Sequence, residues 1–396
     1  MASGEQKLGE LAQQTSTLSL HESPPLLANL PQEIIEEVLA RLPVECLLRF
    51  RCVSKSWLAL ITSHYFVNTH LDVCKNKHES GRNRLFLIAS FSGLGKICSI
   101  SSIVPQNSSP TLIELSRFSK SPCRSPRILG SCNGLLCLST VNFKLMLWNP
   151  STRKSVEFPD SFIQTSSGCY IRYGFGYDER TNDYKVVKMF SFEKNGGRHE
   201  NKVKVFSLRA NSWTMMSGFS SAYIYGKCGV FLNGAIHWEI RDTDVSNSNS
   251  NTASWEIVAL DLGSERYRTM ALPSAENGKF YWTLGVSRGC LLACCIYYPK
   301  RTHLWVMKEY GVAESWTKVA SITLSDDHRG YITVLHMTEN CEEVLLKLGT
   351  QLALYNSRNG SFKHVECVAT PRTIEVQSAT YDESLALLDM GQDSQI

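Results

Sequence analysis

The stretch LPVECLLRFRCVSKSWLALI, from Leu42 to Ile61, is dense in large apolar residues and contains no glycine. Pro31 suits the first position of a preceding helix, and Pro43 ends that helix and can open the next. Residues 29–73 are therefore predicted to form a small helical unit. Between the two prolines, apolar residues recur at the spacing of one helical face: Ile34, Ile35, Val38 and Leu39.

Ser54 fits the N-cap of a third helix in this unit, and Trp57 is expected to pack inside it. A three-helix unit of about 40 residues buries little surface by itself. This one displays more apolar side chains than it could cover, so we expect it to dock either on the rest of this chain or on another protein.

From about Arg84 onward the sequence changes to short apolar or alternating runs separated by Gly, Asn, Asp and Pro. These are strand and hairpin signals at the spacing typical of all-β domains. A second series, which includes WNPSTRKSVEF and YNSRNGSFKHV, follows the first as strand–turn–strand segments. The first series returns about every 50 residues, at Asn133, Asn182, Asn233, Arg288 and Asn340.

A period near 50 residues with about four strands per unit is the signature of a kelch-like β-propeller. Five units are visible, with further strands in residues 84–115 and near the C-terminus. Pairing of the two ends in one blade would close the ring and remove its sheet edges. We predict a multidomain α+β protein, a small N-terminal three-helix unit followed by an all-β, propeller-like domain of six blades. The polar segment 242–254 is predicted to be a loop within one blade.

The chain has 396 residues, with 41 basic and 37 acidic side chains and a net charge of +4. This mild balance gives no reason to expect nucleic acid or a membrane surface as a partner. No apolar run is long enough for a transmembrane helix, and the N-terminus lacks the apolar core of a secretory signal. We expect a polar leader at 1–28, the helical unit at 29–73, a linker at 74–84, the β domain at 85–390 and a tail at 391–396.

The 14 cysteines include no Cys-x-x-Cys pair. We therefore expect reduced cysteines, no metal site, and a location in the cytoplasm, the nucleus or both. Gly174-Phe175-Gly176 begins like a nucleotide-binding G-x-G-x-x-G but lacks the third glycine, so it is expected to form a strand turn. His237 lies in a strand-like run and is expected to be packed. Asp326-Asp327-His328 is expected to form a solvated loop.

The helical segment carries a dense set of residues at fixed spacing: Leu30-Pro31, Ile34-Ile35, Val38-Leu39, Arg41-Leu42-Pro43, the run from Leu47 to Trp57, and Leu60-Ile61. This set closely resembles the F-box motif of plant F-box proteins. Glu45 departs from it, because relatives often carry a basic residue there. A carboxylate near a helix start is favourable, so we expect no loss of binding.

The β-rich part carries a matching set of segments: Gly130–Leu136, Trp148–Arg153, Gly174–Asp178, Asp183–Val187, Val205–Trp213 and Leu304–Trp316. They resemble the F-box-associated domain of the same plant family. That family includes pollen self-incompatibility factors and defence-related F-box proteins, so the resemblance names no target.

The resemblance implies that the F-box docks on the Skp adaptor of a Skp–cullin–F-box ubiquitin ligase and, through it, on a cullin. The β domain would hold a target protein for ubiquitination and proteasomal degradation. No cofactor and no catalytic residue is implied, because such a subunit acts by proximity. The adaptor is expected to contact Leu30, Pro31, Ile34, Ile35, Val38, Leu39, Leu42, Pro43, Leu47, Leu48, Phe50 and Val53.

Target contacts are expected on the blade loops around one mouth of the ring. Aromatic turn residues are the candidates, because aromatic side chains are common interface anchors; these are Tyr223, Tyr225 and Tyr298. Two alternatives stay open. The protein could be an F-box scaffold that does not promote degradation, or a propeller enzyme fused to a protein-binding segment.

Overall fold

The computed structural model describes residues 30–76, 83–89, 95–103, 113–114, 126–139, 144–158, 169–193, 199–219, 222–241, 255–298, 301–324, 332–365 and 376–386. The chain separates into two compact units, Met1–Leu42 and Pro43–Ile396. None of the helices in these ranges is long and apolar enough to cross a membrane.

The first unit contains the helix α2 (Gln32–Ala40). Pro31 precedes it with φ −54° and ψ 144°, so the proline is the N-cap residue and not, as predicted, the first helical residue. The fixed φ of proline still sets the direction in which the chain enters the helix. Glu33 lies in the first turn, where its charge favours the helix dipole.

The second unit begins with α3 (Val44–Phe50), α4 (Lys55–Thr62) and α5 (His64–Asn76). Pro43 precedes α3 as predicted. The hydroxyl of Ser54 accepts a hydrogen bond from the amide of Trp57 at 3.1 Å, which confirms the predicted N-cap. Phe50 and Trp57 meet edge to face at 5.4 Å, so the indole packs among the helices.

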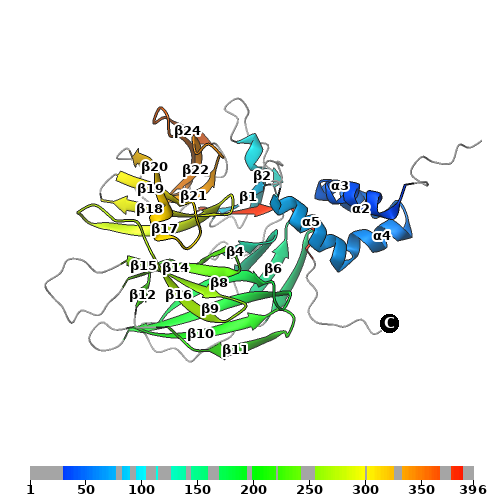
Figure 1. The fold of residues 1–396 in the computed structure, drawn as a ribbon, viewed down its shortest axis with the longest axis horizontal. Coiled ribbons are helices and arrows are strands. Elements are labelled where there is room, and N and C mark those ends of the chain that lie inside the picture. Colours follow the sequence, from blue (N-terminus) through cyan, green and yellow to red (C-terminus); the bar gives the residue numbers. More distant parts are fainter. Residues whose placement is uncertain are drawn as a thin grey trace, which may run out of the picture. The chain divides into compact units, whose positions relative to one another are not determined.

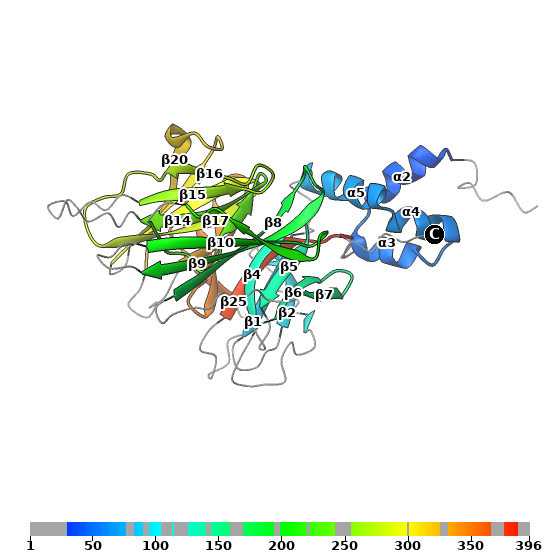
Figure 2. The same ribbon diagram turned by 90° about the horizontal axis from the view of Figure 1, so that it is seen from below.

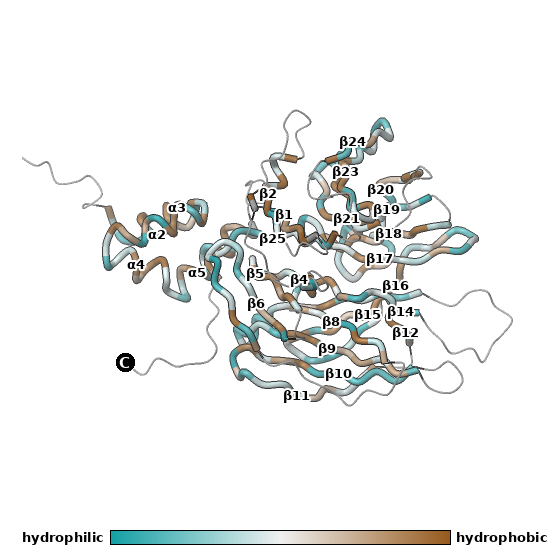
Figure 3. Tube along the Cα trace, turned by 180° about the vertical axis from the view of Figure 1, so that it is seen from behind, coloured by the Kyte–Doolittle hydropathy of each residue, from teal (hydrophilic) through white to brown (hydrophobic). Residues whose placement is uncertain are grey.

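Helix α5 is a fourth helix, which was not predicted from the sequence. The hydroxyl of Ser63 accepts a hydrogen bond from the amide of Phe66 at 3.1 Å and starts this helix. Phe66, His70 and Leu71 are buried on one side of it. Figure 3 shows hydrophobic and hydrophilic residues following one another along α2, α3 and α4, as amphipathic helices require.

The described strands form six antiparallel sheets, which we number as blades (Figure 1). Blade 1 contains β25 (Val376–Asp382), β1 (Asn83–Ala89), β2 (Gly95–Ser99) and β3 (Ile113–Glu114). Blade 2 contains β4 (Arg127–Cys132), β5 (Leu135–Ser139), β6 (Leu145–Asn149) and β7 (Lys154–Phe158). Blade 3 contains β8 (Cys169–Asp178), β9 (Asp183–Glu193), β10 (His199–Ser207) and β11 (Ser212–Met216).

The other three blades follow in chain order. Blade 4 contains β12 (Tyr223–Ile224), β13 (Val230–Leu232), β14 (Ala235–Arg241), β15 (Trp255–Asp261) and β16 (Arg266–Ala271). Blade 5 contains β17 (Phe280–Ser287), β18 (Cys290–Tyr297), β19 (Arg301–Met307) and β20 (Trp316–Thr323). Blade 6 contains β21 (Ile332–Met337), β22 (Glu343–Leu348), β23 (Gln351–Asn356) and β24 (Phe362–Val365).

The innermost strands β4, β8, β13, β17, β21 and β25 contact one another around the ring. The ring closes in blade 1, where the last strand β25 pairs with β1 from Val376 opposite Ala89 to Asp382 opposite Asn83 (Figure 2). The predicted six-bladed propeller after a helical unit is confirmed. Segment 242–254 lies outside the described residues, between strands β14 and β15 of one blade.

The period near 50 residues arises from the first hairpin of successive blades. Asn133-Gly134 and Asn233-Gly234 connect their strands with positive φ at both residues, and Arg288-Gly289 does the same in blade 5. Two consecutive residues at positive φ define the two-residue turn that matches the twist of a hairpin. Glycine and asparagine tolerate this conformation, so the turns leave a clear sequence signal.

Blade 4 departs from the pattern because its innermost position is divided between β12 and β13, which both pair with β14. Between them the chain turns toward β8. The amide of Gly229 donates to the carbonyl of Tyr173 at 2.8 Å, and the amide of Tyr173 donates to the carbonyl of Lys227 at 3.1 Å. This parallel pairing ties blade 4 directly to blade 3.

Gly174 and Gly176 lie inside strand β8, not in the strand turn that the sequence predicted. A Cβ atom on Gly174 would come 2.6 Å from the Trp238 ring, and one on Gly176 would come 2.3 Å from the Phe231 ring. The two glycines therefore let β8 lie close against the aromatic side chains of blade 4.

Candidate functional site

Exposed apolar side chains lie on helix α2 and just before it. Leu30, Ile34 and Val38 are 44%, 43% and 52% exposed. Ile34 and Val38 are four residues apart in α2 and share one face, and Leu30 lies two residues before the helix begins. We call these three residues the α2 spine.

The other predicted adaptor contacts divide by burial. Leu39 and Leu47 are buried, at 2% and 0% exposure. Ile35, Leu42, Leu48 and Phe50 are half-buried, and Pro31, Pro43 and Val53 are exposed.

Two further exposed apolar residues, Leu58 on α4 and Tyr65 on α5, were not predicted. Helical spacing gave no signal for Leu58, because Ile61, one turn away on the same side of α4, is fully buried. Together with Val53 and the three residues of the α2 spine, Leu58 and Tyr65 make up six of the twelve exposed large apolar side chains of the described chain. Exposed apolar side chains concentrated in one part of a chain indicate an interaction surface.

The three candidate target-binding tyrosines lie at one end of blades 4 and 5. Tyr223 and Tyr225 form an edge-to-face pair with ring centres 4.8 Å apart. Tyr298 follows β18, and its amide donates to the carbonyl of Lys279 at 3.0 Å, next to the start of β17. Tyr225 and Tyr298 are exposed, whereas Tyr223 is half-buried.

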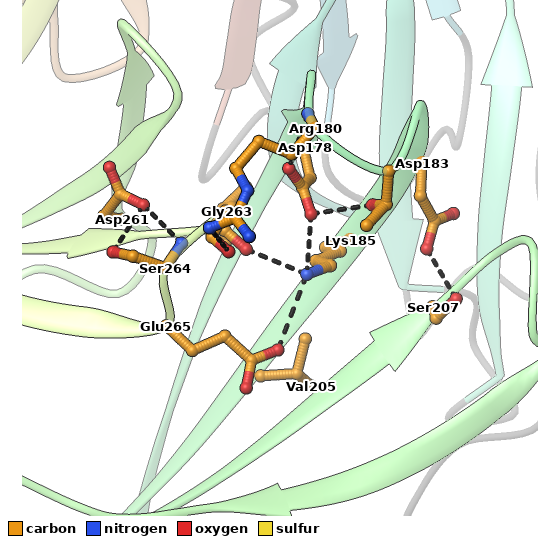
Figure 4. A network of polar contacts seen from close by, with 12 residues as sticks. Asp178, Arg180, Asp183, Lys185, Val205, Ser207, Asp261, Gly263, Ser264 and Glu265 are labelled. Atoms are coloured by element: carbon orange, nitrogen blue, oxygen red, sulfur yellow. Dashed lines mark hydrogen bonds and ion pairs between the residues drawn. The ribbon is translucent and has the colours of Figure 1, made fainter.

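A polar network joins blades 3 and 4 at the opposite end of the propeller (Figure 4). The ammonium group of Lys185 lies 2.9 Å from the carboxylate of Asp178 and 3.5 Å from that of Glu265. It also donates to the carbonyl of Leu262 at 2.8 Å. Both Lys185 and Asp178 are buried, so the ion pair is largely removed from solvent.

Burial would raise the pKa of Asp178. Hydrogen bonds from Thr181 and Lys185, together with the charge of Lys185, outweigh burial and hold this pKa below its usual value. Arg180 adds a second link, since its guanidinium donates to the carbonyl of Gly263 at 2.9 Å. The network acts as an inter-blade tie, and its charged groups are engaged with one another.

His237 on β14 is buried and hydrogen-bonded. Its ring nitrogens lie 3.1 Å from the carbonyl of Val230 and 2.7 Å from the hydroxyl of Tyr310. Burial lowers the pKa of His237 to about 4, although the Val230 carbonyl opposes this shift. A histidine held neutral by packing matches the expectation that His237 is a core residue.

Glu239, also on β14, is a buried carboxylate that accepts backbone hydrogen bonds. Its Oε1 atom accepts from the amide of Leu284 at 2.5 Å. Burial raises the pKa of Glu239 to about 7. The backbone hydrogen bonds that it accepts, including those from Leu284 and Gly226, oppose this rise. Glu239 lies on the part of β14 that pairs with neither β12 nor β13.

The cysteines and other potential metal ligands of the described ranges form no metal-binding cluster. Within the described residues, no group of three or more His, Cys, Asp or Glu side chains is arranged to hold a metal ion. No disulfide joins the described cysteines, and burial raises the pKa of Cys228 and Cys294 to about 12, which keeps these thiols protonated. Asp326-Asp327-His328 lies outside the described residues.

Comparison with known proteins gives two matching families. The F-box domain family matches residues 27–69, and the F-box associated beta propeller domain family matches residues 88–381. An F-box/kelch-repeat protein of Arabidopsis thaliana is 32% identical over 346 residues, covering 85% of this chain and 90% of that protein. The F-box protein CPR1 of Arabidopsis thaliana is 30% identical over 348 residues, covering 81% of this chain and 80% of that protein.

Solved structures show only a distant likeness. A fucose-specific lectin from Aleuria aurantia has a TM-score of 0.41 and 10% identity, covering 74% of this chain and 97% of that chain. A likeness at this level carries no argument about how this chain works.

Proposed function

This chain belongs to the family of F-box proteins with an F-box-associated β-propeller, and on that premise we propose that it is the substrate-recognition subunit of a Skp–cullin–F-box E3 ubiquitin ligase. The helical part binds a Skp-type adaptor and, through it, a cullin. The propeller binds a target protein. The complex works in the cytoplasm, the nucleus or both.

The observation that carries this proposal is the α2 spine of Leu30, Ile34 and Val38. An apolar stripe at helical spacing is the form in which a helix enters a groove of another protein. Full burial of such a side chain stabilises by about 1.5–3 kcal/mol, so roughly half of that is available from each half-exposed residue. Three to six residues of this kind offset a substantial part of the cost of association.

Leu39 and Leu47 have almost no surface left to bury. We therefore assign them to stabilising the helices and not to direct contact with the adaptor. The adaptor surface then consists of exposed and half-buried residues: Leu30, Pro31, Ile34, Ile35, Val38, Leu42, Pro43, Leu48, Phe50 and Val53.

The subunit contributes proximity and no chemical step of its own. A target held on the propeller shares one assembly with the ligase that carries the activated ubiquitin. Tethering replaces a bimolecular encounter with an effective concentration set by the geometry of the complex. The buried side chains of Lys185 and Glu239 take part in contacts between blades, which agrees with a holding role.

Titration of the full-length protein with a purified Skp-type adaptor tests the adaptor face. Ile34→Asp combined with Val38→Asp should abolish measurable binding, because two charges would replace the apolar stripe. Met215→Asp is the matched control, since Met215 is 62% exposed on β11 of the propeller. Undiminished binding by the α2 double variant, with an unchanged melting curve, would refute the assigned face.

Loss of target protein in cells separates a degradative receptor from an F-box scaffold. Targets that accumulate on the propeller when the proteasome is blocked, and disappear when it is released, support the receptor. Targets that stay bound at constant abundance in both conditions contradict it.

A further inference from the structure

A row of aromatic rings crosses the ends of blades 3, 4 and 5. Tyr170 in β8 meets Tyr223 in β12 with 6.0 Å between ring centres, and Tyr223 meets Tyr225 at 4.8 Å. Tyr225 meets Trp255 of β15 at 4.4 Å, and Trp255 meets Phe280 of β17 at 6.5 Å. We call these five residues the aromatic row.

The aromatic row is partly open to solvent. Tyr170 and Tyr225 are 43% and 38% exposed. They are two of the six large apolar side chains that are exposed in the described part of the propeller. Exposed aromatic side chains are the usual anchors of a protein interface.

Two arginines lie over these rings. The guanidinium of Arg172 lies 5.6 Å from the centre of the Tyr170 ring and 5.9 Å from that of Tyr223. The guanidinium of Arg241 lies 6.0 Å from the centre of the Trp255 ring. Arg172 is buried, and its guanidinium already donates to the carbonyl of Ile224 and to the hydroxyl of Tyr223. A guanidinium beside a ring that keeps some N–H groups free can donate them to an anion.

The pairing of Arg241 indicates the charge of the partner. Its guanidinium donates to the hydroxyl of Tyr225 at 3.4 Å, and no carboxylate in the described ranges pairs with it. Arg301, by contrast, forms an ion pair with Glu276 at 2.6 Å. Arg241 thus lies half-buried beside an apolar row with donors available for a carboxylate or a phosphate.

The aromatic row lies at the end of the propeller where the innermost strands β8, β12 and β17 begin. The chain enters the propeller at the opposite end, because β1 begins at Asn83 opposite Asp382, the last residue of β25. A partner on the aromatic row therefore does not compete for space with the point at which the helical part joins the ring.

We propose that the aromatic row and Arg241 form a docking site for an acidic, extended segment of a protein, whose anionic side chain pairs with Arg241 and whose apolar side chains contact Tyr170 and Tyr225. The proposal rests on the proposed function, in which the propeller holds a protein target, and it names the chemistry of that target. The anion is an aspartate or glutamate carboxylate or a phosphorylated side chain.

Single-stranded RNA is the competing ligand, because bases also stack on aromatic rows. The ring planes argue against it. Tyr170 and Tyr223 are inclined at 81°, and Tyr223 and Tyr225 at 84°. Successive bases need ring faces presented to them, whereas edge-to-face tyrosines suit the irregular side chains of a peptide.

Panning of a random peptide pool on the full-length protein tests the proposal. Bound peptides should be enriched in Asp and Glu and depleted in Lys and Arg. A second pool that contains phosphoserine separates the two sources of anion. A synthetic peptide from the enriched set should lose about 10-fold or more in affinity with Arg241→Gln, as expected for a lost charge-assisted hydrogen bond.

Tyr170→Ser provides a second variant outside the core and should also weaken the peptide. Arg266→Gln is the matched control, because Arg266 is exposed at the start of β16, at the other end of the propeller, and should leave the affinity unchanged. Melting curves of all variants establish that they are folded.

Three results would overturn the proposal: no enriched peptides, no preference for acidic residues, or a preference that folded Arg241→Gln retains. Displacement of the peptide by a uridine oligonucleotide at equal or lower concentration would assign the row to RNA. Adaptor binding measured on the same preparation separates the two proposals. Intact adaptor binding with no peptide preference rejects only the docking site, and the reverse outcome rejects only the adaptor role.

Discussion

Glu239 in blade 4 accepts a hydrogen bond from the backbone amide of Leu284 in blade 5, with 2.5 Å between the oxygen and the nitrogen. This side-chain hydrogen bond joins two neighbouring blades. It does so where the innermost position of blade 4 is divided between β12 and β13. A buried carboxylate at this place makes the join between two blades sensitive to protonation.

Glu239 should give the fold a stability that falls as the pH rises. Burial raises its pKa to about 7 from 4.5, so between these values the folded chain holds a proton that the unfolded chain has released. This contribution is fully present below about pH 4.5 and is lost as the pH rises through about 7, by up to about 3 kcal/mol. Glu239→Gln should flatten the decline of the melting temperature between about pH 5 and pH 8. If the melting temperatures of the wild type and of Glu239→Gln change with pH in the same way, Glu239 does not cause the decline.

His237 should give the fold a stability that falls as the pH falls. Because burial lowers its pKa to about 4, the folded chain excludes a proton that the unfolded chain binds below about 6.5. Its contribution is present above pH 6.5 and is lost as the pH falls toward 4. His237→Gln should reduce the loss of stability on the acid side, measured by denaturant titration at several pH values.

Lys185→Met should destabilise the propeller by about 3–5 kcal/mol, because it leaves the buried carboxylate of Asp178 without its cation. The control is Lys144→Met. Lys144 pairs with Glu157 at 3.2 Å, and the two side chains are 60% and 53% exposed. Loss of such a surface pair costs less than about 1 kcal/mol. Chemical denaturation of both variants measures the difference, and equal losses would show that the tie between blades 3 and 4 contributes little.

Removal of residues 376–396 should unfold or aggregate the protein. The deletion takes away β25, which pairs with β1 along its whole length, and it leaves β1 as an open edge in the centre of the ring. Removal of residues 387–396 alone spares β25 and the tail segment whose carbonyls accept from Asn149. Size-exclusion chromatography and circular dichroism distinguish the two truncations. A monomeric, cooperatively melting product of the longer deletion would show that the ring does not need this closure.

The helices and the blade count could be predicted from the sequence because their signals are local. Ser54 caps α4 through the amide of a residue three positions away. The turn at Asn133-Gly134 needs only its own two residues at positive φ. Five visible repeats with leftover strands at both ends favour pairing of those ends in a sixth blade, so even the ring closure was implied.

The candidate site could be predicted only in part. Val38 and Leu39 are adjacent and similarly apolar, yet one is 52% exposed and the other 2%. The resemblance to the F-box motif placed both of them on the adaptor face. The tyrosines of the β domain were chosen as turn residues, and no local pattern indicated that Tyr223 would meet Tyr170 from another blade.

By itself the sequence determined most of the helices and strands, how many blades they make and which family the chain belongs to. Caps, turns and periodicity act within a few residues or repeat along the chain, and a linear pattern records them. The tertiary structure alone decided which apolar side chains stay in water, that blade 4 is divided and joined to blade 3, and that Arg241 lies over Trp255. These depend on which segments from distant parts of the chain become neighbours, because burial and charge pairing follow from contacts in space.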